Sequence, residues 1–139
     1  METLTSLSAR SLQYYVITNK WSSDLEFFRV ECGFFHRLLD DYFVRLSDSI
    51  HIAKLKELGQ KLYQLERDSN LAEKKLSKQL GQLELMAEDV IPEDAEELAG
   101  KQVELEYLMC NLTREHREVK NELFRQVEAV ITDSKYTTG

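Results

Sequence analysis

The stretch that decides the fold is "LEFFRVECGFFHRLLDDYFVRL", residues 25–46. Apolar side chains recur in it at alternating steps of three and four residues, the heptad spacing of helices that pack along a seam. The seam positions are Leu25, Phe28, Cys32, Phe35, Leu39, Tyr42 and Leu46. Just before them, Ser23 and Glu26 form an S-x-x-E capping box. The pattern predicts a first helix over about residues 22–47.

The same spacing continues in two later segments, which predict a second helix over 52–88 and a third over 93–133. The second carries Leu55, Leu58, Leu62, Leu65, Ser69, Ala72, Leu76, Gln79, Leu83 and Met86, with Val90 just beyond its end. The third carries Leu98, Gln102, Leu105, Met109, Leu112, His116, Val119, Leu123, Gln126 and Val130. The polar pair Ser69 and Asn70 is the point where the second helix is most open to a kink or break.

The boundaries between these helices have turn and cap chemistry. Residues 47–51, "SDSIH", can end one helix and start another. In "DVIPED", residues 89–94, Asp89 is the expected cap of the third helix and Pro92 is expected in its first turn. Short loops place successive helices antiparallel. We therefore expect one all-α domain over residues 1–139, an elongated up-down-up three-helix antiparallel coiled-coil bundle.

A helix that starts at residue 22 is too short to cover the far ends of the other two, given a rise of about 1.5 Å per residue. Residues 1–20 are therefore expected to be partly helical and to pack on the bundle near Leu76 to Leu105. The side chains expected to make this contact are Leu7, Leu12, Tyr15 and Val16.

The first helix has a second apolar side, formed by Phe27, Val30, Phe34 and Leu38. A helix that is apolar nearly all round is normally covered on two sides. The cover could come from residues 1–20, from a fourth helix or from a second copy of the chain. An uncovered apolar patch of this size is typical of an interaction site.

Three residues were considered as metal ligands: His36, Asp40 and His116. His36 and Asp40 are four residues apart and share a helix face. The sequence lacks the Glu-x-x-His pairs of di-iron bundles. His116 lies on a seam, where a polar side chain more often sets helix register, as Ser69, Gln79, Gln102 and Gln126 could also do. We expect no metal and no cofactor, and a metal-binding or redox bundle is the alternative hypothesis.

Composition narrows the function further. A net charge of −7 argues against nucleic-acid binding, because phosphate contacts need a basic face. Cys32 and Cys110 form no C-x-x-C motif, no apolar run reaches the ~20 residues needed to span a bilayer, and no secretory signal is visible. We find no catalytic motif. These observations favour a cytoplasmic, non-enzymatic protein with reduced thiols.

One charge cluster stands out between the second and third helices. Glu93, Asp94, Glu96 and Glu97 make this expected hairpin tip strongly acidic. Acidic residues favour the start of a helix, and they can also dock a basic partner. We therefore expect an interaction or scaffold protein that acts through the apolar side of the first helix and through the acidic tip. Its expected partners are other proteins, including itself as a homodimer.

Overall fold

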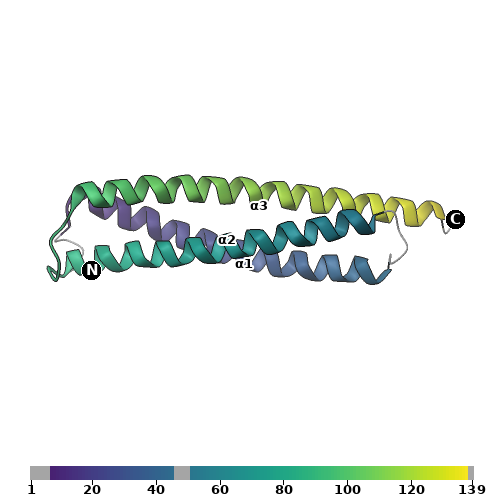
Figure 1. Ribbon diagram of the computed structural model, residues 1–139, viewed down its shortest axis with the longest axis horizontal. Coiled ribbons are helices and arrows are strands. Elements are labelled where there is room, and N and C mark those ends of the chain that lie inside the picture. Colours follow the sequence, from purple (N-terminus) through teal and green to yellow (C-terminus); the bar gives the residue numbers. More distant parts are fainter. Residues whose placement is uncertain (1–6, 46–50, 138–139) are drawn as a thin grey trace. The chain divides into compact units, whose positions relative to one another are not determined.

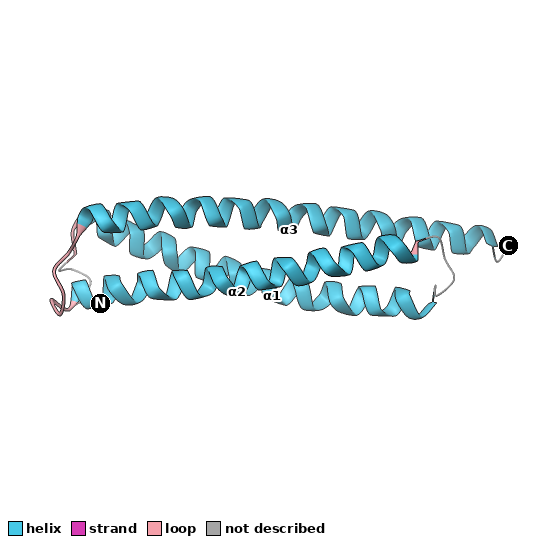
Figure 2. Cartoon of the chain, viewed as in Figure 1, coloured by secondary structure: helices cyan, strands magenta, loops and turns pink. Residues whose placement is uncertain are grey.

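The computed structural model describes residues 7–45 and 51–137. The described residues form three α-helices, α1 (Ala9–Arg45), α2 (Ile52–Ala87) and α3 (Ala95–Thr137), and no strand (Figure 1, Figure 2). Helix pairs pack against each other, which confirms the predicted all-α three-helix class. The seam residue Leu46 and residues 47–50 of the expected turn lie outside the described residues.

The chain divides into two compact units, each built from a segment of every helix. Unit 1 contains Met1–Phe27 and Ser69–Asn111, and unit 2 contains Phe28–Asp68 and Leu112–Gly139. In unit 1, α1 and α3 run parallel, because Ser8 contacts Glu93 and, further along both, Thr18 contacts Gln102. In unit 2 they are parallel too, since Glu31 contacts Lys120 and Phe35 contacts Phe124. That residues 1–139 form one domain stays a prediction.

The first helix begins at Ala9, and the predicted start near residue 22 was wrong. Ser8 is the actual N-cap: its Oγ accepts a hydrogen bond from the Ser11 backbone N–H at 3.2 Å. Residues 9–22 contain no proline or glycine, so nothing interrupts the helix before Ser23 and Glu26, which lie inside it. An S-x-x-E pattern marks a helix start only where the preceding chain is not helical.

The N-terminal residues pack in unit 1, as expected, but partly through other side chains. Leu7 joins a buried cluster with Leu83, Met86, Ala87 and Leu98, and Tyr15 packs against it. Leu12 and Val16 were predicted to pack there and are exposed. The buried positions are instead Ser11 and Thr18. Thr18 can be buried because its Oγ1 donates a hydrogen bond to the Tyr14 carbonyl at 2.7 Å.

The seam predictions for α2 and α3 are confirmed at most described positions. All ten seam positions predicted for 52–88 are buried, and α2 continues without a break through Ser69 and Asn70. In α3 the predicted positions from Leu98 to Leu123 are buried, and Gln126 is half-buried. Val90 was predicted on the seam and is exposed, because α2 ends at Ala87.

The loop from α2 to α3 explains this boundary. Asp89 has a φ of 58°, in the left-handed region. Val90 N–H donates to the Leu85 carbonyl at 2.9 Å and Asp89 N–H to the Met86 carbonyl at 3.2 Å, which is the Schellman pattern of a helix end. Asp89 therefore ends α2, and the expectation that it caps the third helix was wrong.

The N-cap of α3 is Asp94. Its Oδ1 accepts a hydrogen bond from the Glu97 N–H at 3.1 Å, and its carbonyl accepts one from the Leu98 N–H at 3.0 Å. Pro92 was expected in the first turn of the helix, but it lies in the loop before it, since α3 begins at Ala95. Asp94 caps α3 rather than Asp89 because it directly precedes the first turn of the helix. Only a residue at that position can reach the free N–H groups of the first turn.

Candidate interaction surface

The apolar side of α1 predicted from the sequence is largely open. Val30 is 68% exposed, Phe34 is 48% exposed, and Leu38 is half-buried, all in unit 2. Phe27, the last residue of unit 1, is 60% exposed. Residues 9–20 do not cover this side, because they belong to α1 itself. The intramolecular cover considered from the sequence is therefore wrong for the described residues.

Helix α3 adds apolar side chains beside α1 in unit 2. Phe35 is buried, and its ring lies 6.1 Å from that of Phe34 and 6.0 Å from that of Phe124. Phe124 is 43% exposed and Ile131, seven residues further on the same helix face, is 41% exposed. We call Val30, Phe34, Leu38, Phe124 and Ile131 the α1–α3 face. Sequence reasoning missed Phe124 and Ile131, because their exposure depends on how α1 and α3 pair.

An ion pair crosses between the two helices that form this face. Lys120 Nζ lies 3.0 Å from Glu31 Oε2, and the Glu31 side chain is only 19% exposed. His116 lies next to it, with Nε2 at 3.5 Å from Glu31 Oε1 and without a hydrogen-bond partner among the described residues. The His116 ring stacks on Phe28 at 4.4 Å between centroids. Burial lowers the pKa of His116, opposed by Glu31 and reinforced by Lys120.

The three candidate metal ligands are not brought together. His36 on α1 contacts the Glu66 carboxylate and the Tyr63 ring, both on α2, while His116 faces α1 from α3. Asp40 is exposed. Within residues 7–45 and 51–137, no group of three or more His, Cys, Asp and Glu side chains is placed to hold a metal ion. The described residues therefore contain no set of ligands for the alternative hypothesis, a metal-binding or redox bundle.

The cysteines occupy different environments. Cys32 is buried, and burial raises its pKa to about 11, with further contributions from Glu66 and Glu31. Its thiol is therefore protonated at neutral pH and packs as a small apolar group. Cys110 is exposed, and both thiols are free.

Three of the four acidic-tip residues have structural roles in unit 1. Glu93 Oε1 accepts hydrogen bonds from the Ser8 hydroxyl at 2.8 Å and from the Ser8 N–H at 3.2 Å, at the N-terminus of α1. Hydrogen bonds from Ser11 and Ser8 lower the pKa of Glu93. Asp94 caps α3, and Glu97 pairs with Lys101 at 3.0 Å. Three of the four acidic-tip side chains are thus engaged within unit 1, so fewer carboxylates are available to bind a partner.

Two of the polar seam residues form a hydrogen-bonded set in unit 1. Gln102 Oε1 accepts from Gln79 Nε2 at 3.3 Å, and Gln102 Nε2 donates to Thr18 Oγ1 at 3.3 Å. Ser69 is buried in the same unit, but its Oγ has no hydrogen-bond partner among the described residues. Thr18 was missed from the sequence because a start at residue 22 leaves it outside the helix.

None of the helices, over the residues searched, is long and apolar enough to cross a membrane. Comparison of the chain with protein-family models, with curated proteins and with solved structures finds no match. The interpretation of this surface therefore depends on its own chemistry.

Proposed function

We propose that the protein is a non-enzymatic, cytoplasmic interaction protein whose α1–α3 face packs against a helix of a partner protein. The observation that supports this proposal most directly is the exposure of Phe34 and Phe124, whose rings both contact the buried ring of Phe35, with the exposed Val30 one helical turn before Phe34. Apolar side chains scattered singly are normal on a protein surface, whereas a contiguous group marks a docking surface.

The shape of the face favours a helical partner. Val30, Phe34 and Leu38 recur every four residues along α1, and Phe124 and Ile131 are one heptad apart on α3. Two such rows beside each other resemble the hydrophobic groove in which an amphipathic helix lies. The first partner to test is a second copy of the chain, which would present the same two rows.

Sedimentation equilibrium across a wide concentration range tests self-association. The wild-type chain is expected to form a dimer, and Val30→Glu with Phe34→Glu is expected to return it to a monomer, because a buried carboxylate is strongly disfavoured. Leu71→Glu is the matched control, since Leu71 is an α2 residue of unit 1 that is 52% exposed and lies outside the face. This variant should dimerise like the wild type.

Two results would count against the proposal. A wild-type chain that stays monomeric at all concentrations contradicts the homodimer. A dimer that survives Val30→Glu with Phe34→Glu but is lost in Leu71→Glu moves the interface away from the α1–α3 face.

A further inference from the structure

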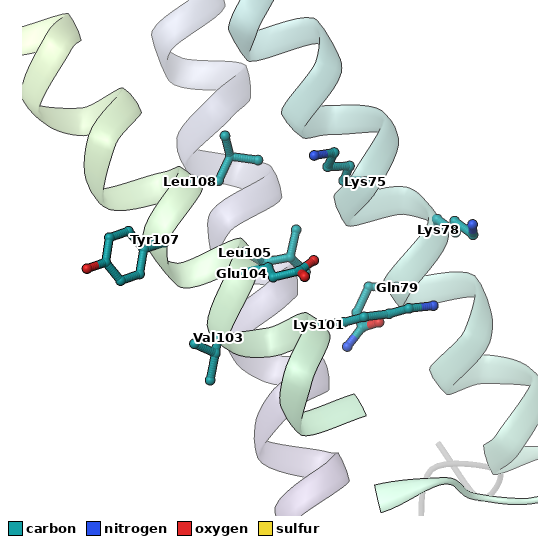
Figure 3. A pocket seen from close by; sticks show the side chains of 9 residues that line it. All are labelled: Lys75, Lys78, Gln79, Lys101, Val103, Glu104, Leu105, Tyr107 and Leu108. Carbon is teal, nitrogen blue, oxygen red and sulfur yellow. The ribbon is translucent and has the colours of Figure 1, made fainter. Parts of the chain in front are cut away.

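A second surface lies in unit 1, where α2 and α3 border a groove of about 680 Å³ (Figure 3). This volume falls within the range of about 300–1,000 Å³ that is usual for small-molecule sites. The groove does not include the α1–α3 face, so its role is independent of the proposed function.

The groove carries positive charge on a chain whose net charge is −7. Three lysines line it, Lys75 and Lys78 from α2 and Lys101 from α3, against one carboxylate, Glu104. Lys101 pairs with Glu97, but no ion pair of the described residues involves Lys75 or Lys78. Figure 3 shows Lys75 extending from α2 toward α3 and Lys101 extending from α3 toward α2. The fold leaves ammonium charge here that an anion can neutralise.

The rest of the lining is apolar, with one buried amide. Leu105 is buried, Leu108 is half-buried, and Tyr107 is 72% exposed at the edge of the groove. Gln79 is 1% exposed, and its Nε2 is held by the Gln102 side chain at 3.3 Å and the Leu98 carbonyl at 3.5 Å. These hydrogen bonds fix the wall below the lysines, so the groove is formed before any ligand arrives.

We propose that this groove binds a small amphipathic carboxylate. The carboxylate lies between Lys75 and Lys101, where both ammonium groups can donate charge-assisted hydrogen bonds. The apolar chain lies against Leu108, which is half-buried, and beside the buried Leu105, so that it covers the part of Leu108 that is open to water (Figure 3). Neither a simple anion nor a neutral alcohol uses both parts of the groove.

Titration of the ¹⁵N-labelled full chain with octanoate, followed by amide chemical shifts, tests the proposal. We expect saturable shifts at residues 75–79 and 101–108, and smaller shifts with acetate or octan-1-ol at the same concentration. Lys75→Gln combined with Lys101→Gln is expected to raise the Kd for octanoate about a hundredfold, because it removes two hydrogen bonds to a charged group, each worth about tenfold. Lys74→Gln removes one positive charge from an exposed α2 position outside the groove, as either single groove substitution does, and should change the Kd less than twofold.

Each other outcome overturns the proposal. Equal binding of octan-1-ol shows that the lysines do not select an anion, and equal binding of acetate shows that the apolar wall is not used. Equal weakening by Lys74→Gln shows a diffuse charge effect. Octanoate shifts confined to the α1–α3 face place the ligand elsewhere.

Discussion

Unit 1 and unit 2 follow the same heptad pattern but accommodate their polar interior residues differently. In unit 1 the buried polar residues are uncharged, and Gln102 hydrogen-bonds both Thr18 and Gln79, although Gln79 Oε1 has no partner among the described residues. In unit 2, His116 is stacked on Phe28 beside the charged Glu31 carboxylate, and its Nε2 accepts or donates no hydrogen bond within the described residues. The apolar seam residues determine which side of each helix is buried. The polar residues on the seam determine how the stability of each unit changes with mutation and with pH.

The largest expected effect is the loss of an aromatic ring from unit 2. Phe35 is 1% exposed and contacts the rings of Phe34, His116 and Phe124. We expect Phe35→Ala to lower the free energy of unfolding by about 4 kcal/mol, through lost burial and a residual cavity. Urea unfolding followed by far-ultraviolet circular dichroism measures it.

The matched substitution in unit 1 is Leu83→Ala, which removes a fully buried leucine from the cluster around Leu7. We expect this substitution to lower the free energy of unfolding by about 3 kcal/mol. If Leu83→Ala costs more than Phe35→Ala, the aromatic contacts of unit 2 add nothing beyond ordinary leucine packing.

The hydrogen-bonded set of unit 1 is the next test. Gln102→Leu removes one hydrogen-bond partner from each of Thr18 and Gln79, which keep only the Tyr14 and Leu98 carbonyls as partners. We expect it to lower the free energy of unfolding by about 2 kcal/mol. Combining it with Thr18→Val and Gln79→Leu removes all three polar groups, and the triple variant should regain most of that loss. A triple variant that is less stable than Gln102→Leu alone would show that Thr18, Gln79 and Gln102 stabilise unit 1 by more than satisfying one another's hydrogen bonds.

A smaller effect concerns pH and unit 2. The pKa of His116 is lowered in the folded protein, mainly by burial, from its usual value near 6.5. The unfolded chain therefore binds a proton first as the pH falls, so stability is present above about pH 6.5 and is lost on acidification toward the folded pKa. Between pH 7.5 and 5.5 the loss is at most about 1.4 kcal/mol, the limit for an imidazole that takes up no proton in the folded protein.

His116→Leu should remove this part of the pH dependence, because leucine does not titrate. Urea unfolding of both proteins at pH 7.5 and 5.5 gives the difference, because the contributions of titratable groups common to both proteins cancel. If the two proteins lose the same stability on acidification, His116 is not the group that responds to pH.

Heptad spacing alone predicted most of the buried surface of this protein. Every described position of the α2 seam through Met86 was anticipated, because a period of 3.5 residues leaves little ambiguity about which face is buried. Helix ends were predicted less well. Ser23 with Glu26, and Asp89 with Pro92, carry genuine cap and turn chemistry, but Ser8 and Asp94 are the residues that cap the helices.

The candidate surface was predicted in part for a related reason. Phe27, Val30, Phe34 and Leu38 were identified from α1 alone, since their side of the helix follows from spacing. Phe124 joined them only in the structure, because its place beside Phe35 depends on the parallel pairing of α1 and α3. The predicted up-down-up order already makes α1 and α3 parallel, but no local signal in the sequence sets the axial register that brings Phe124 beside Phe35.

The smallest expected effect is at the helix end of unit 1. Glu93 accepts hydrogen bonds from Ser8 at the start of α1, where a negative charge interacts favourably with the helix dipole. Glu93→Gln should lower the free energy of unfolding by about 0.5 kcal/mol at pH 7, and the lowered pKa of Glu93 means that this contribution disappears as the pH falls below about 4.5. Glu106→Gln, at an exposed position in the middle of α3, makes the same charge change and should have little effect. Equal losses in the two variants would assign the effect to net charge, and Glu93 would then have no specific role in starting α1.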